Sequence, residues 1–131
     1  MDIRIEHRIN EAMLWESQVC QYPKLGPAGI SYFRGDFPDD PERYADCLLF
    51  RDKHGKLRGI LNHYPVYISR HEKVGYVNIW VEPRFQRKGI GTKLLAEALK
   101  RWEINFEQQK YSPSGERFIR KFLNKFSYSA V

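Results

Sequence analysis

This sequence has no long apolar run and only two cysteines. No stretch is apolar over the roughly 18 positions that a membrane-spanning helix needs, and no apolar segment near the N-terminus resembles a signal peptide. Cys20 and Cys47 lie far apart and have no metal-ligand spacing, so we expect two free thiols and no metal site. These absences favour a cytoplasmic protein without a membrane partner.

Two phosphate-binding patterns are also missing. A P-loop requires Gly-x-x-x-x-Gly-Lys-Ser/Thr, but Thr92 and Lys93 follow Gly91 in the reverse order. A dinucleotide fingerprint requires a third glycine where this chain has Leu94. The sequence therefore argues against a nucleoside triphosphatase and against a Rossmann domain.

What is present indicates one globular domain over residues 1–131. Apolar residues make up 42% of the chain and aromatic residues 15%, enough for a sizeable core. The net charge of +6 favours anionic partners, among them nucleic acids.

The most informative stretch runs from residue 76 to residue 102. β-branched and aromatic residues from Tyr76 to Val81 predict a strand that ends before Pro83. A helix is predicted next, because apolar residues recur at three- and four-residue spacing and form one stripe: Ile90, Leu94, Leu95, Ala98, Leu99 and Trp102.

A basic, glycine-containing segment, residues 86–92, joins this strand to this helix. The first N–H groups of a helix lack intrahelical acceptors and attract anions, and glycines let the backbone approach a phosphate closely. Arg87 and Lys88 add two positive charges. Glycines often serve turn geometry alone, but in this context the segment predicts a phosphate cradle.

This stretch resembles motif A of the GNAT superfamily of N-acetyltransferases. The resemblance rests on Val81-Glu82-Pro83 at the strand end and on Gln86-Arg87-Lys88-Gly89-Ile90-Gly91, followed by Thr92. It implies an α/β (α+β) fold with a mixed, mostly antiparallel central sheet flanked by helices. It also implies binding of acetyl-CoA, with the pantetheine arm along Ile79, Trp80 and Val81. The pyrophosphate would be held by Gln86, Arg87, Lys88, Gly89, Ile90, Gly91 and Thr92.

The residues before this stretch are less regular. A helix is expected over Ile9–Cys20, and glycines and prolines in residues 22–45 predict a long loop. That loop carries aromatic residues, including Tyr32 and Phe33, beside four acidic residues: Asp36, Asp39, Asp40 and Glu42. They either form an acceptor pocket for a cationic amine or simply fix and solvate the loop.

Residues 46–68 predict a hairpin with its turn at Asp52–Gly55 and a returning strand over residues 57–67. His63 in that strand is either a catalytic base facing the cleft or a structural histidine. After the central helix, alternation from Ile104 to Tyr111 predicts another strand. Ser112-Pro113 predicts the start of a last helix with its own apolar stripe: Phe118, Ile119, Phe122, Leu123 and Phe126.

The catalytic groups depart from the resembled family. Many members carry Asn, then Ala, then a Tyr that protonates the departing thiolate. Ser112 stands at the place of the Asn and is assigned to the cofactor, whereas the Tyr position holds Ile119 or Leu123. We therefore assign Tyr111 as a substitute proton donor. Asn78 cannot accept a proton, and Glu82 lies towards the pyrophosphate end.

The resemblance implies an N-acetyltransferase in which an amine attacks acetyl-CoA directly in a ternary complex; the amine is not identified by the sequence. Two rivals remain. One is a catalytically degenerate acyl-CoA-binding module, which the missing Tyr favours. The other is a nucleic-acid-binding protein that uses the basic residues of the last helix: Arg117, Arg120, Lys121 and Lys125.

Overall fold

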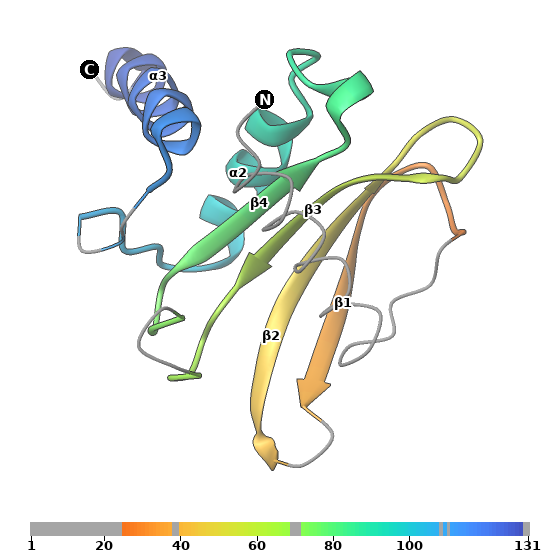
Figure 1. The fold of residues 1–131 in the computed structure, drawn as a ribbon, viewed down its shortest axis with the longest axis vertical. Helices are drawn as coiled ribbons and strands as arrows, with labels where there is room; N and C mark the ends of the chain where they lie inside the picture. The colour runs from red at the N-terminus through yellow and green to blue at the C-terminus, as the bar shows by residue number, and fades with distance from the viewer. Residues whose placement is uncertain (1–24, 38–39, 69–71, 108, 110, 130–131) are drawn as a thin grey trace.

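The computed structural model describes residues 25–37, 40–68, 72–107, 109 and 111–129. They form an antiparallel sheet in the order β1-β2-β3-β4, together with two α-helices (Figure 1). The strands are β1 (Gly29–Phe37), β2 (Asp40–Arg51), β3 (Leu57–His63) and β4 (Val77–Val81). The 3-10 turn η2 (Pro83–Phe85), α2 (Ile90–Arg101) and α3 (Pro113–Ser129) follow. This mixed α/β fold confirms the expected fold class.

Helix α2 packs against one face of the sheet. Its apolar stripe contacts Leu48 of β2, Leu61 of β3 and Val77 of β4. Gly59 allows the close approach, since a Cβ there would lie 2.9 Å from Cγ2 of Ile90. The buried stripe is the one that the sequence predicts: Ile90, Leu94, Leu95 and Ala98.

The opposite face of the sheet has its own buried cluster: Ala45, Cys47, Leu49, Ile60, Tyr64, Tyr76 and Trp80. Side chains alternate between the two faces along each strand, so consecutive residues of β2 serve different cores. Cys47 is buried here, with its Sγ 3.9 Å from the Ala45 carbonyl.

Helix α3 begins where the sequence predicts. Pro113 is its first residue, and the backbone N–H of Gly115 donates to Oγ of Ser112 at 3.1 Å, which caps the helix. Ile119 and Phe122 then join the core beneath α2. Figure 1 shows α3 on the β4 side of the sheet, away from β1. Neither described helix is long and apolar enough to cross a membrane.

The prediction of a long loop over residues 22–45 is wrong for the described residues of this range. This region forms β1 and the first half of β2, paired from Gly29↔Arg51 to Phe37↔Asp40. The pairing becomes irregular between Asp36 and Phe37, where the strands turn, and Pro41 lies close to this irregular end. Gly29 therefore starts a strand and Gly35 lies inside it, so these glycines do not indicate a continuous loop.

Two strand predictions also need correction. Strand β3 ends at His63 rather than continuing to residue 67, because the chain bends at Pro65 and Val66. The described residues between Ile104 and Tyr111 are not a strand. The helix expected over Ile9–Cys20 lies outside the described residues.

Candidate cofactor site

The candidate site begins at β4, which is an edge strand among those described. Backbone hydrogen bonds join the two ends of β4 to the β3 side. Before β4, the N–H of Tyr64 donates to the Tyr76 carbonyl at 3.0 Å; after it, the N–H of Glu82 donates to the Arg58 carbonyl at 2.8 Å. Backbone direction alternates along an antiparallel strand. The backbone groups of Val77, Ile79 and Val81 therefore point away from β3, to the outer edge.

Two glutamine side chains occupy the ends of this outer edge. Nε2 of Gln86 donates to the Val81 carbonyl at 3.1 Å. At the other end, the N–H of Val77 donates to Oε1 of Gln109 at 3.0 Å, and Nε2 of Gln109 donates back to the Val77 carbonyl. Between them, the N–H and C=O of Ile79 and the N–H of Val81 have no hydrogen-bond partner in the described part of the chain; we call these three groups the free edge.

The loop from β4 to α2 ends in a left-handed turn. Arg87 has φ 64° and Gly89, the residue before α2, has φ 83°. No side chain in the described part of the chain caps the helix, so the N–H groups of Ile90, Gly91 and Thr92 face out of its positive end without a described capping acceptor. A Cβ at Gly89 would meet no atom of the described residues within 4 Å, so the glycine serves the backbone conformation and leaves space beside it.

Gly91 has a different structural use. A Cβ on it would lie 3.3 Å from the ring of Phe118, so this glycine lets α3 pack against the start of α2. The two glycines of the motif therefore shape the open cradle and its supporting wall, respectively.

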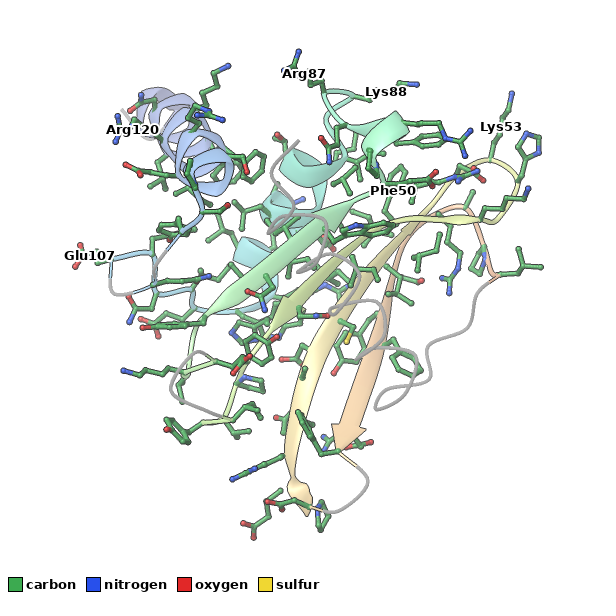
Figure 2. All side chains as sticks on the ribbon, viewed as in Figure 1. Phe50, Lys53, Arg87, Lys88, Glu107 and Arg120 are labelled. Atoms are coloured by element: carbon green, nitrogen blue, oxygen red, sulfur yellow. The ribbon has the colours of Figure 1, made fainter. Side chains whose placement is uncertain are left out.

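Positive charge gathers at this loop. Arg87 and Lys88 are exposed and project from the end of the molecule near η2 (Figure 2). Neither forms an ion pair with a described residue; Nζ of Lys88 lies 5.1 Å from the ring centre of Phe85. Both charges therefore remain available to an anion, as the sequence predicts for a phosphate cradle.

A third cation, Arg58, is instead used structurally. Its Nε bonds Oδ2 of Asp52 at 2.8 Å, its Nη1 bonds Oε2 of Glu82, and its guanidinium covers the ring of Phe85. The bond from Arg58, with backbone N–H groups of the turn, lowers the pKa of Asp52 from 3.8 to about 2. Glu82 is thus engaged in an ion pair that holds the loop, rather than being an unpaired base.

The candidate acid–base residues are dispersed. The hydroxyl of Tyr111 donates to the Phe106 carbonyl at 2.7 Å, and burial raises the pKa of this phenol. Its role as a proton donor stays a prediction, as does cofactor contact for Ser112, which here caps α3. Of the two candidates for the missing Tyr position, Ile119 is in the core and Leu123 is 37% exposed.

On β4, side chains at Asn78 and Trp80 lie on the face opposite α2. Asn78 is exposed, and its Nδ2 donates to the Tyr64 hydroxyl at 2.9 Å. Trp80 is buried, and its backbone faces β3 rather than the free edge. Any contact of Trp80 with a pantetheine arm therefore stays a prediction and would not use its backbone.

His63 belongs to a separate cluster on the α2 face, in which His63 and Asp46 are buried and Tyr32 is exposed. Its Nδ1 lies 3.0 Å from Oδ2 of Asp46, while Tyr32 donates to Oδ1 of Asp46 at 2.6 Å. The imidazole stacks on Trp102 with ring centres 4.7 Å apart. Burial and the bond to Asp46 raise the pKa of Tyr32. Sequence reasoning missed this cluster because its members come from β1, β2, β3 and the end of α2.

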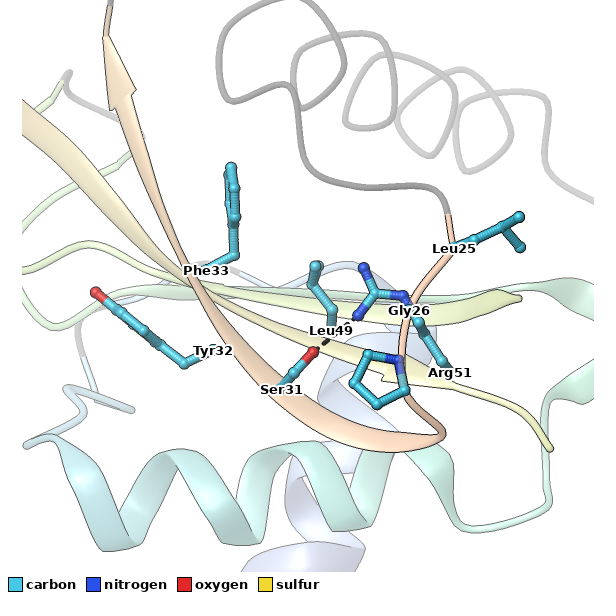
Figure 3. Close-up of a pocket in the computed structure, with 8 residues that line it drawn as sticks. Leu25, Gly26, Ser31, Tyr32, Phe33, Leu49 and Arg51 are labelled. Atoms are coloured by element: carbon cyan, nitrogen blue, oxygen red, sulfur yellow. Dashed lines mark hydrogen bonds between the residues drawn. The ribbon is translucent and has the colours of Figure 1, made fainter. Parts of the chain in front are cut away.

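An acidic acceptor pocket around Tyr32 and Phe33 is not what the described residues form. Both line a cavity of about 190 Å³ whose charged lining residue is Arg51, which donates to Oγ of Ser31 at 2.8 Å (Figure 3). Asp36 pairs with Arg34 and Asp40 with Arg43, away from that cavity.

The edge strand of this antiparallel sheet leads through a basic glycine loop into a helix without a described side-chain cap. This arrangement is typical of one class of protein, the N-acetyltransferases of the GNAT type. Residues 11–106 match the family described as "Acetyltransferase (GNAT) family". This chain belongs to the GNAT acetyltransferase family, whose members generally use acyl-CoA donors. Comparisons with curated proteins and with solved structures gave no match.

Proposed function

We propose that this protein transfers an acetyl group from acetyl-CoA to an amine in a ternary complex. One observation carries the proposal: the free edge at Ile79 and Val81 leads directly to an uncapped helix start flanked by two unpaired cations. A pantetheine arm carries amides that can pair with the free edge as an added strand would. Its pyrophosphate then lies at Gly89–Thr92, beside Arg87 and Lys88.

In the proposed reaction, a neutral amine attacks the thioester carbonyl. A carbon–nitrogen bond forms, the carbon–sulfur bond breaks, the amine proton leaves to water, and the thiolate takes a proton. The Ile79 N–H is the donor we assign to the developing oxyanion, because it belongs to the free edge. Tyr111 is the proposed proton donor to the thiolate, for which its hydroxyl must leave the Phe106 carbonyl. Most of the rate would come from positioning.

Thermal unfolding with and without acetyl-CoA tests this proposal. A ligand at about a hundred times its dissociation constant stabilises the folded state by about 2.7 kcal/mol. Gly89→Glu should abolish the shift, because it adds a negative charge and a side chain to the cradle. Gly29→Glu is the matched control: Gly29 has φ 94°, a Cβ there would have no described atom within 4 Å, and the residue lies at the start of β1.

The wild type and Gly29→Glu should shift with acetyl-CoA, and Gly89→Glu should not. No shift in the wild type would contradict the proposed function. Release of free CoA in the presence of amines would then show turnover.

A catalytically degenerate acyl-CoA-binding module is the second candidate. It is favoured by Ile119 in the core, by an amide at Asn78 and by a Glu82 held by Arg58. It shares the thermal shift but predicts no CoA release with any amine. A nucleic-acid-binding role for Arg117, Arg120 and Lys121 predicts instead salt-dependent retention on RNA or DNA that acetyl-CoA does not affect.

A further inference from the structure

We propose that Gln109, by pairing with the backbone of Val77, ends the free edge on the side away from the cradle. We infer that it thereby fixes the position of the thioester and restricts the acyl group to short chains. This inference rests on the proposed function, since it concerns the acyl donor of the same site. It makes Gln109 a positioning residue, one that acts by limiting where the donor can lie.

The first step is the two-point contact of Gln109 with β4. Its amide both accepts from the N–H and donates to the C=O of Val77, as the backbone of a neighbouring strand would. The loop that carries Gln109 is anchored alongside, because the N–H of Asn105 donates to the Gly75 carbonyl at 2.9 Å. The edge below Ile79 is therefore already paired by the protein.

The second step is the length of the β4 edge that remains for an acyl donor. Strands rise about 3.4 Å per residue, so Val77 and Val81 are separated by roughly 14 Å. Gln86 donates a hydrogen bond to the Val81 carbonyl at the end next to the cradle, and Gln109 accepts one from the Val77 N–H at the other end. A donor that enters from the cradle can pair as far as Ile79, and then meets the Gln109 amide.

The third step is the direction in which the donor must turn. On the α2 face, Val77 is 4% exposed and packs in a cluster with Phe106, Tyr111 and Ile119. On the opposite face, Asn78 is exposed between the buried side chains of Tyr76 and Trp80. Two buried polar atoms on that opposite face, Oδ1 of Asn62 and Nε1 of Trp80, have no hydrogen-bond partner among the described residues. The thioester therefore turns towards Asn78, and the amine approaches from that side.

Chain-length preference follows from this geometry. An acetyl group needs little space beyond the thioester. A long acyl chain must either displace Gln109 from Val77, which leaves two edge groups unpaired, or extend over the exposed Asn78 into water.

The test measures dissociation constants of CoA, acetyl-CoA, butyryl-CoA and octanoyl-CoA by calorimetry for the wild type, Gln109→Ala and Glu107→Ala. Glu107 is exposed in the same loop and is the matched control. We expect octanoyl-CoA to bind the wild type and Glu107→Ala about tenfold more weakly than acetyl-CoA, a difference of about 1.4 kcal/mol. In Gln109→Ala the two should bind within about threefold of each other.

The outcomes separate the two proposals. If no CoA compound binds the wild type, the proposed function fails. If CoA binds but the chain-length profile is flat in the wild type, is unchanged in Gln109→Ala, or changes equally in Glu107→Ala, the role of Gln109 is overturned. Gln109→Asn, whose amide is one carbon shorter, gives the same readout if the alanine variant does not fold.

Discussion

At the scale of single residues, Arg58 connects the turn after β2 to the end of β4. It binds Asp52 and Glu82 at once and covers Phe85, so one guanidinium holds the approach to the cradle. Its engagement leaves Arg87 and Lys88 as the cations of the loop that can meet a ligand. The division is physical: a paired cation orders the loop, and unpaired cations attract anions.

Asp52 gives this arrangement a measurable pH dependence. Its folded pKa, about 2, lies below its ordinary value of 3.8, so the unfolded chain binds more protons between these values. The stabilisation is fully present above about pH 4 and is lost as the pH falls towards 2. Urea unfolding at several pH values should show this loss in the wild type and a smaller loss in Asp52→Asn. Asp36→Asn, at an exposed ion pair, is the control, and equal effects of the two variants would contradict the prediction.

At the scale of elements, the contact of α2 with β3 depends on Gly59. A Cβ there would lie 2.9 Å from Ile90 and 3.2 Å from Leu94, both buried side chains. Gly59→Ala should therefore lower the free energy of unfolding by about 1–3 kcal/mol through overpacking. The measurement is the urea midpoint at an unchanged slope, and an unaltered midpoint would show that α2 can shift without cost.

The contact between α2 and the sheet also positions the candidate cofactor site. The cradle connects β4 to α2 and includes the first N–H groups of α2. A shift of α2 away from the sheet therefore also displaces these N–H groups. Its other support is Phe118 of α3 against Gly91. Packing in the core and geometry in the cradle are therefore linked through one helix.

At the scale of the whole molecule, the net charge of +6 favours association with a polyanionic ligand such as acetyl-CoA. Arg87→Ala and Lys88→Ala should each weaken acetyl-CoA binding by roughly two- to fivefold at low salt, and the difference should vanish near about 1 M salt. Lys73→Ala, an exposed cation before β4, is the control. If all three variants weaken binding equally, overall charge rather than the cradle is responsible. Calorimetric titration at two salt concentrations gives the answer.

The sequence by itself determined the elements whose signals are local. The stripe of α2, the Ser112 cap and proline start of α3, and the basic glycine loop were all confirmed, because periodicity, capping and helix-end chemistry involve neighbours along the chain. The fold class and the family followed from the same stretch. The cofactor contacts assigned to that loop stay predictions with a supporting geometry.

Only the tertiary structure decided which distant residues meet. The glycines of β1 and the prolines on either side of it hid this strand from the sequence analysis, and its pairing with β2 revealed it. Gln109 bonds Val77 across 32 positions, and Asp46 bonds His63 across 17; the sequence pattern encodes neither contact. Strand pairing and buried hydrogen bonds depend on how the whole chain packs, so a local signal cannot specify them.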